Sequence, residues 1–287
     1  MKNSTNQGIS VLMPVKNAEK TIVLAVKSTL RAMNKRSEIL ILLDGCSDST
    51  ETKVRSIKDP RIRVISSTEP LGVARALNQL AAEAKFEILA RMDGDDITLP
   101  WRFKTQLKAF SKLNPDILFP SHAVFGDPVS PRLRPSVWCK LNPAESRLAL
   151  CVSNPFVHPG AMMKKSVYID LGGYKECPAE DYDLWIRACL ANYSIVRIAT
   201  PGILIRLHGG SVTQNPVWQE KLKRDPQVLK SLAELRRLEL GGEDDSNAKI
   251  AIDKESVVYR KLLSLARKQR TLVKFLLFRN LRKVTNE

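Results

Sequence analysis

The sequence predicts an α/β fold in which a mainly parallel β-sheet is flanked by helices and followed by a C-terminal helical extension. Four short apolar runs rich in β-branched residues recur within the first hundred residues of this 287-residue chain. Between them lie segments whose apolar residues recur at spacings of three and four, which is typical of helices. Strands that alternate with helices form βαβ units, and nearly all-apolar strands are typical of a sheet covered on both faces.

The first part of the chain predicts a regular series of elements. The strands are expected at 9–15, 38–43, 62–66 and 87–92, and the helices between them at 18–33, 49–58 and 73–84. Asn17 can cap the first helix and the Asp48-Ser49-Thr50 stretch can cap the second, because such side chains accept hydrogen bonds from the N–H groups of a first helical turn.

The following part is less regular. Its expected elements are a helix at 100–113, a proline-rich passage from Pro115 to Pro143, helices near 144–150 and 180–191, and a strand at 194–206. We therefore predict one domain over residues 8–214, built from a half at 8–96 and a half at 97–214. A basic helical extension at 215–287 completes the chain.

Composition limits the class of protein. Five cysteines, an odd number without any C-x-x-C spacing, disfavour a disulfide framework and a structural zinc site. No apolar run approaches the roughly 18 to 20 residues that span a bilayer, and the run at 9–15 is too short for a secretory signal. These features predict a cytoplasmic protein. The net charge of +16 points to a polyanionic partner such as nucleic acid, anionic lipid or a phosphorylated ligand.

The residues at the carboxyl ends of the predicted strands are the candidate site, because ligands bind there in parallel sheets. The first strand leads into Pro14-Val15-Lys16-Asn17, the second into Asp44, and the fourth into Asp93-Gly94-Asp95-Asp96. Three carboxylates within four residues repel one another unless a cation is present. Carboxylate oxygens favour hard cations, so the pattern predicts a Mg²⁺ or Mn²⁺ site, the alternative being an acidic turn.

Two familiar phosphate-binding motifs are missing from the sequence. It contains no G-x-x-x-x-G-K-[ST] loop and no G-x-G-x-x-G after the first strand, which disfavours an NTPase and a dinucleotide oxidoreductase. A diphosphate neutralised by a metal, with its base and ribose held by Asp44 and the first loop, remains open.

Six segments resemble, in order, the inverting family-two glycosyltransferases, which have the A-type nucleotide-diphospho-sugar transferase fold. They are SVLMPVKN at 10–17, LDGCSDST at 43–50, LGVARALN at 71–78, MDGDD at 92–96, NPFVHPG at 154–160 and GGYKECPAEDYDLW at 172–185. The resemblance covers roughly residues 8–214. It implies a Rossmann-like sheet with a nucleotide-sugar-binding half at 8–96 and an acceptor half at 97–214.

The resemblance also implies the roles of individual residues in binding the donor and a metal. Asp44 would contact the nucleobase, and Arg75 would lie near the diphosphate. Asp95 would hold the metal, and the late His208 would complete its shell, unless His208 is only a solvated loop residue. The full set implied for donor binding is Pro14, Val15, Asn17, Asp44, Arg75 and Asp93.

The acceptor half supplies the proposed base. Asp181 would take the proton of the attacking hydroxyl, and a single base with direct attack inverts the anomeric carbon. The metal and Arg75 would offset the charge of the leaving nucleoside diphosphate. The residues expected on the acceptor side are His158, Glu180 and Trp185. The alternative for Glu180 and Asp181 is that they only favour a helix N-terminus.

Some residues depart from the family pattern. Lys16 stands where a neutral residue such as Tyr is common, and Asn78 lies two positions later than the usual A-R-N. No Q-x-x-R-W, the signature of processive synthases, is present. We therefore expect transfer of a single sugar to a saccharide or lipid-linked acceptor, in surface polysaccharide or glycolipid assembly.

The end of the chain predicts a membrane contact. Residues 256–287 carry nine Lys/Arg against one acidic residue, interleaved with leucine, valine and phenylalanine. A helix with an apolar stripe and basic flanks is typical of a segment lying on an anionic membrane surface, here the inner face. The alternative is that the stripe packs on the domain.

Two other functions compete with this interpretation. A nucleic-acid-binding protein on a similar fold would explain the charge, but the basic residues are concentrated late and lack interleaved aromatic residues. A sugar-nucleotide-forming nucleotidyltransferase would need a Gly- and Arg-rich loop after the first strand. We expect no nucleic-acid partner.

Overall fold

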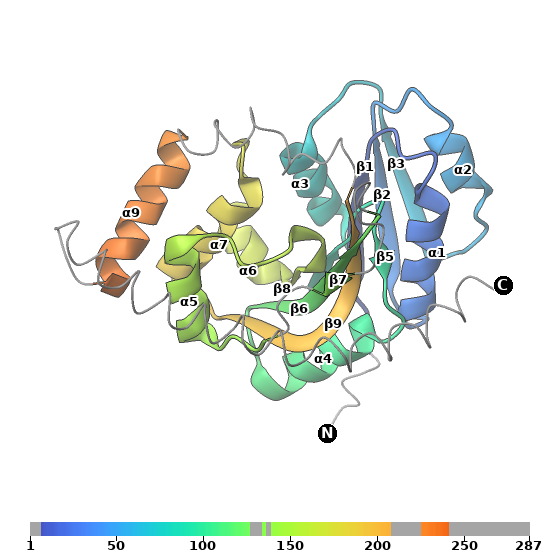
Figure 1. The fold of residues 1–287 in the computed structure, drawn as a ribbon. Helices are drawn as coiled ribbons and strands as arrows, with labels where there is room; N and C mark the ends of the chain where they lie inside the picture. Colours follow the sequence, from blue (N-terminus) through green and yellow to red (C-terminus); the bar gives the residue numbers. More distant parts are fainter. Residues whose placement is uncertain (1–6, 127–133, 136–138, 208–224, 241–287) are drawn as a thin grey trace.

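The computed structural model describes residues 7–126, 134–135, 139–207 and 225–240. Within these residues the strands form one nine-stranded sheet in the order β3-β2-β1-β4-β8-β6-β9-β5, with β7 paired to β6. Helices cover both faces of the sheet (Figure 1). One core lies between the sheet and helices α1, α2 and α4, and the other between the sheet and helices α3, α5, α6, α7 and α9.

Residues 8–96 form the parallel part of the sheet. Its strands are β1 (Ser10–Val15), β2 (Glu38–Asp44), β3 (Ile62–Ser67) and β4 (Ile88–Arg91), and its helices are α1 (Ile22–Ala32), α2 (Thr50–Ser56) and α3 (Val73–Glu83). β1 pairs with β2 and β4, and β2 pairs with β3, always in parallel. All seven elements predicted for this half are confirmed, with shifted ends.

The two predicted caps have different outcomes. α1 begins only at Ile22, without a side-chain cap, so the prediction that Asn17 caps it is wrong. Asn17 instead lies in the loop, with a φ of 47°, and accepts a hydrogen bond from the Ser47 N–H at 2.9 Å. At the start of α2 the N-cap residue Ser49 makes no side-chain cap bond, but Asp48, in the same predicted stretch, accepts a hydrogen bond from the Thr50 N–H at 2.9 Å.

Residues 97–207 extend the sheet with strands of both directions. The strands are β5 (Ile97–Thr98), β6 (Ile117–Phe125), β7 (Arg134–Pro135), β8 (Met162–Lys164) and β9 (Ile195–Arg206). The helical elements are α4 (Arg102–Leu113), α5 (Pro143–Val152), the 3₁₀ turn η2 (His158–Gly160), α6 (Lys165–Asp170) and α7 (Glu180–Leu190). β8 runs antiparallel to β4 and β6, whereas β6 and β9 are parallel. α4, α5, α7 and β9 confirm the predicted elements.

The sequence did not predict β6, which lies within the proline-rich passage. Pro120 stands in the middle of this strand, between β8 and β9 in the sheet. Because proline has no N–H to donate to the ladder, an interior strand tolerates it only at an irregularity. The pairing of β6 with β9 shifts register on both sides of Ser121, directly after Pro120. This irregularity, a β-bulge, therefore accommodates Pro120, although proline disfavours an interior strand.

Helix α9 (Pro226–Leu240) is the described part of the C-terminal extension, and it packs beside α5 and α7 (Figure 1). Its buried residues are Val228, Leu232 and Leu235. Polar contacts add to this packing, because Arg147 forms an ion pair with Glu239 at 2.6 Å. The boundary at 214/215 stays a prediction, and residues 256–287 lie outside the described residues. No helix in the described ranges is both long and apolar enough to cross a membrane.

Candidate active site

The carboxyl ends of β1 and β2 form one rim of the site. The Asp44 side chain, at the end of β2, is buried and accepts hydrogen bonds from the Leu71 and Gly72 N–H groups, the latter at 3.1 Å. Gly72 has a φ of 82° and precedes α3, so the carboxylate orders the loop that starts this helix. Asp44 thus lies at the predicted rim, with both oxygens engaged by backbone.

Three of the residues predicted to bind the donor differ in exposure. Asn17 is exposed, whereas Pro14 is half-buried. The side chain of Val15 is buried, and a Cβ placed at Gly94 would meet it at 3.2 Å. Val15 therefore packs under the acidic loop, and only its backbone could reach a donor.

The acidic loop after β4 brings three carboxylates together. One oxygen from each of Asp93, Asp95 and Asp96 lies within 4.8 Å of the others. Burial raises the pKa of Asp96 well above its ordinary value, and the neighbouring carboxylates raise it further. A hydrogen bond from the Arg206 N–H at 2.8 Å has the opposite, smaller effect on this pKa. Burial also raises the pKa of Asp93. A hard cation would relieve this repulsion, so the donor set fits Mg²⁺ or Mn²⁺.

Two buried arginines support this loop, and sequence reasoning missed both. Arg91, the last residue of β4, is 8% exposed and pairs with Asp93 at 2.7 Å, while its Nε and Nη1 find no hydrogen-bond acceptor among the described residues. Arg102, on α4, is fully buried, and its Nη2 donates to the carbonyls of Arg91 and Pro159, both at 2.8 Å. Burial lowers the pKa of Arg102 to about 9.

Available sequence signals could have drawn attention to these arginines. Arg91 directly precedes the Met92-Asp96 motif, and Gln106 stands one helical turn after Arg102, where it accepts a hydrogen bond from Arg102 Nε at 3.0 Å. Neither signal says that the guanidinium groups turn inward. Arg102 joins the end of β4 to the turn that carries His158.

A second cluster lies at the N-terminus of α7. Ligand-capable atoms of His158, Glu180 and Asp181 lie within 4.8 Å of one another. Burial raises the pKa of both carboxyl groups, while burial and the Arg91 charge hold the pKa of His158 well below its ordinary value. His158 is therefore neutral, and its Nε2 lies 2.8 Å from the Tyr174 hydroxyl. The Arg91 charge acts on both clusters.

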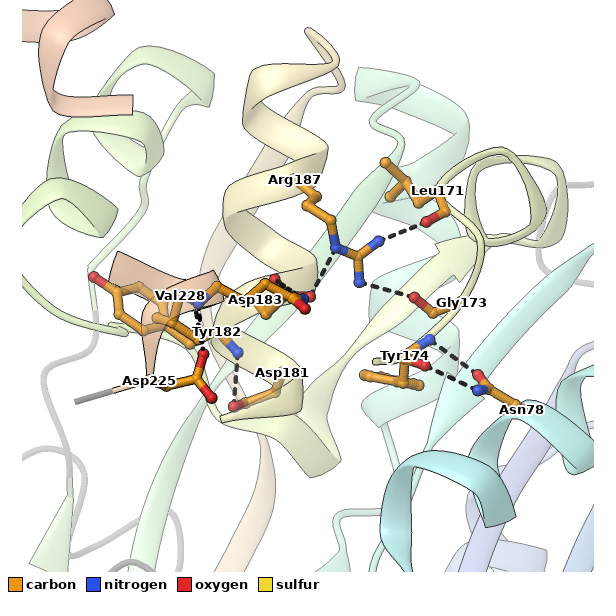
Figure 2. A network of polar contacts seen from close by, with 11 residues as sticks. Asn78, Leu171, Gly173, Tyr174, Asp181, Tyr182, Asp183, Arg187, Asp225 and Val228 are labelled. Carbon is orange, nitrogen blue, oxygen red and sulfur yellow. Dashed lines mark hydrogen bonds and ion pairs between the residues drawn. The ribbon is translucent and has the colours of Figure 1, made fainter. Parts of the chain in front are cut away.

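Asp181 has both carboxylate oxygens engaged. Its Oδ1 accepts from the Tyr182 N–H at 2.7 Å, and its Oδ2 accepts from Asn154 Nδ2 at 2.8 Å. The first of these contacts is visible in Figure 2. Each oxygen retains a further lone pair, so the group can still accept a proton from a bound hydroxyl.

The loop at 171–179 is anchored to helices on both sides (Figure 2). Asn78, on α3, accepts from the Tyr174 N–H and donates to the Tyr174 carbonyl, both at 2.9 Å. Arg187, on α7, donates to the Gly173 carbonyl at 2.8 Å and pairs with Asp183 at 2.7 Å. Asn78 therefore links the two halves of the chain.

Three remaining residues predicted for the site differ in where they lie. Arg75 is exposed on the first turn of α3 and pairs with Glu176 at 2.7 Å. Trp185 is fully buried, with its ring against Phe119 at 4.9 Å and beneath His158 at 6.2 Å. The expectation that Trp185 faces the acceptor is therefore corrected: the helix turns it into the core, where it supports His158. His208 lies outside the described residues.

Comparisons with known proteins agree with this arrangement. The family model "Glycosyl transferase family 2" matches residues 10–172. The amylovoran biosynthesis glycosyltransferase AmsE of Erwinia amylovora is 28% identical over 238 residues, which cover 80% of this chain and 85% of the relative. The Escherichia coli protein WfgD, named UDP-Glc:alpha-D-GlcNAc-diphosphoundecaprenol beta-1,3-glucosyltransferase, is 29% identical over 119 residues. That match covers 42% of this chain and 47%, less than half, of WfgD.

Solved structures share the fold. The crystal structure of S. aureus TarS residues 1–349 with UDP-GlcNAc has a TM-score of 0.64 and 17% identity, and the match covers 80% of this chain and 67% of TarS. None of the relatives described here supports the alternative of a nucleic-acid-binding protein. The family match spans more than half of the chain and includes the acidic loop. The chain belongs to glycosyl transferase family 2 and is a glycosyltransferase.

Proposed function

We propose that this glycosyltransferase moves a single sugar from a nucleotide-diphospho-sugar to an acceptor hydroxyl with inversion of the anomeric carbon. One observation carries the proposal. An acidic cluster suited to a hard cation, at the end of β4, stands near a separate half-buried carboxylate cluster at the start of α7, with Arg91 acting on both. The first cluster suits a diphosphate, and the second suits a hydroxyl that must lose its proton.

A divalent metal fits the acidic loop. We propose Asp95 as a principal ligand, because it matches the metal-binding position of the family's acidic motif and one of its carboxylate oxygens lies within 4.8 Å of one oxygen each of Asp93 and Asp96. Mg²⁺ and Mn²⁺ are the candidates by ligand chemistry, and His208 is proposed to complete the shell. When bound, such an ion would offset negative charge on the departing nucleoside diphosphate.

The donor would lie across the rim formed by β1 and β2. Asp44 is proposed to receive the nucleobase and Asn17 to line the same pocket, together with the backbone of Pro14 and Val15. Arg75 is proposed to bind the diphosphate from the first turn of α3. Its exposed guanidinium is within reach of solvent, although it now pairs with Glu176.

Asp181 is proposed as the general base. Its two hydrogen bonds hold the carboxylate in place while leaving lone pairs for the acceptor hydroxyl. The acceptor hydroxyl would displace the nucleoside diphosphate directly, without a nucleophile supplied by the protein. A single displacement of this kind would invert the anomeric carbon. Glu180 and neutral His158 are proposed to line the acceptor side.

The acceptor is proposed to be a saccharide or a lipid-linked saccharide in surface polysaccharide or glycolipid assembly. The printed names of AmsE and WfgD support this class. We further propose that the protein works at the cytoplasmic face of the membrane, with residues 256–287 on the anionic surface. Salt-sensitive binding to anionic vesicles, lost on truncation at residue 250, would support that location, and no binding at low salt would refute it.

Donor screening tests the central proposal. The protein is incubated with UDP-, GDP- and dTDP-sugars in the presence of Mn²⁺, and nucleotide release is measured with and without excess chelator. We expect release from one nucleotide class, and loss of that release with chelator. Full activity in excess chelator would refute the metal proposal.

A further inference from the structure

Asn154, which lies outside helix α7, donates a hydrogen bond from its side chain to the proposed base. Its Nδ2 donates to Asp181 Oδ2 at 2.8 Å, and its Oδ1 accepts from the Phe156 N–H at 3.1 Å. The backbone N–H can only donate, so the amide oxygen must face it and the amide nitrogen must face the carboxylate. The orientation of the amide is therefore determined by its partners.

The turn that carries Asn154 is held rigidly. It follows the last turn of α5, where the Ser153 N–H still bonds to the Ala149 carbonyl. The Pro155 carbonyl accepts from Arg197 Nη1 at 3.0 Å, and the Phe156 ring stacks on Phe119 at 4.4 Å. A donor fixed by backbone and packing on both sides has little freedom to leave Asp181.

The charged and titratable groups around Asp181 come from several elements. Burial raises the pKa of Asp181, and Glu180 on the same helix raises it further. Arg91 on β4 acts in the opposite direction, and His158 on η2 would do so only when protonated. Tyr174 lies close by in the loop before α7. Asn154 adds a neutral donor, which favours the ionised carboxylate without bringing a charge.

We propose that Asn154 is a positioning residue, which aims the Asp181 carboxylate at the acceptor hydroxyl and keeps it in the form that accepts a proton. The proposal rests on the proposed function, in which Asp181 is the general base. It predicts a specific response to substitution, because Asn154→Asp keeps the shape but replaces the donor by a second carboxyl group. Two carboxyls at this separation cannot both ionise easily.

The test needs no identified substrate. In protein labelled with ¹³C at the aspartate carboxyl groups, the Asp181 signal is assigned by its loss in Asp181→Asn and followed as the pH is raised. We expect Asn154→Ala to move the Asp181 titration to higher pH, and Asn154→Asp to move it further. An unchanged titration in both variants would overturn the proposal.

Asn142→Ala is the matched control. Asn142 caps the other end of α5 by a reciprocal pair of hydrogen bonds with Glu145 and touches no group of the site. It should lower the thermal stability and leave the Asp181 titration unchanged. If Asn142→Ala moved the titration as far as Asn154→Ala does, the effect would be general loosening of α5, and the proposal would be wrong.

Kinetics separate this proposal from the proposed function. With the donor found by screening, Asn154→Ala should lower kcat by about 10- to 100-fold and leave the donor KM nearly unchanged, because a hydrogen bond to a charged group is lost. If Asp181→Asn retained full turnover, the base assignment itself would fail. If Asp181→Asn were inactive while Asn154→Ala kept the wild-type kcat and pH profile, only the role of Asn154 would fail.

Discussion

Residues 8–96 build the sheet one βαβ unit at a time, whereas residues 97–207 add strands in both directions and gather their site residues from distant segments. In the first half the acidic loop is contiguous and follows a single strand. In the second half Asn154 and His158 come from one segment, 154–160, and Tyr174 and Asp181 from another, 172–185. The comparison shows that the acidic cluster is built from one strand end, while the cluster of His158, Glu180 and Asp181 depends on how several elements pack.

The two sites also differ in how their charge is balanced. The acidic loop has Arg91 and the Arg206 N–H as partners, yet retains raised pKa values at Asp93 and Asp96. The cluster at the start of α7 has a neutral amide and a histidine of lowered pKa beside Asp181, the proposed base. The first arrangement is open to a cation, and the second favours proton acceptance.

The largest effect is expected from Asp181→Asn, which keeps the shape but removes proton acceptance. Turnover should fall by about 10² to 10⁴ while donor affinity changes little, because the acceptor half alone is altered. In the wild type, activity should rise as the pH passes the raised pKa of Asp181, since the ionised form is the base. Asp170→Asn, on the exposed end of α6, is the control. Lost donor binding with high residual turnover would make Asp181 structural.

Asp95→Ala should act on the other half. Turnover is expected to fall by about 10² to 10³, and Mn²⁺-dependent donor binding should be lost as well, because the metal would lose a proposed ligand. Isothermal titration with the donor nucleotide and Mn²⁺ measures the binding. Unchanged binding in this variant would show that the acidic loop does not hold the donor metal, and Asp170→Ala should behave as wild type.

Removal of Asn78 should break the link between the halves. Asn78→Ala loses both hydrogen bonds to Tyr174 and one from the Tyr168 hydroxyl, which we expect to cost about 1 to 3 kcal/mol and to lower kcat less than Asp181→Asn does. Denaturant unfolding and steady-state kinetics measure the two effects. Gln79→Ala, exposed on the same helix, is the control. Wild-type stability in Asn78→Ala would argue against this anchor.

Asp96→Asn tests the electrostatic difference through stability. A carboxyl group whose pKa is raised by burial stabilises the fold while protonated, and this contribution is lost as the pH rises above about 4 through the raised pKa. Without metal, the variant should therefore match the wild type near pH 4 and melt about 2 to 4 °C higher at pH 8. Mn²⁺ should reverse that order at pH 8. If the metal-free variant were less stable than the wild type at pH 8, ionisation of Asp96 would not destabilise the fold, and this explanation would be wrong.

The smallest effect is expected from Glu176→Gln. The Arg75–Glu176 pair is exposed, so its loss should change stability by less than about 1 kcal/mol. If Arg75 binds the diphosphate, freeing it should lower the donor KM by up to about fivefold. Glu51→Gln, which breaks a similar exposed pair with Arg55 at 2.7 Å, is the control. A higher donor KM in Glu176→Gln would refute the idea that Glu176 competes with the donor diphosphate for Arg75.

Much of the fold followed from local pattern, and the exceptions have physical reasons. The strands and helices of residues 8–96 were predictable because buried parallel strands and amphipathic helices repeat simple spacings. β6 was missed because Pro120 disfavours an interior strand. β8 was missed because a strand of three residues is too short to show an alternating pattern of apolar and polar residues. Asn17 was wrongly expected to cap α1 because its pairing with Ser47 lies outside the helix.

The sequence by itself determined the order of the elements, the strand ends that carry Asp44 and the acidic loop, and the presence of Asp181 at a helix start. These are local properties of neighbouring residues. Only the tertiary structure decided that Arg91 and Arg102 turn inward, that Trp185 packs in the core, that Asn78 holds Tyr174, and that Asn154 reaches Asp181. Most of these contacts join residues far apart in the chain. They depend on the packing of whole elements, and the spacing of residues in the sequence does not show which way a side chain turns.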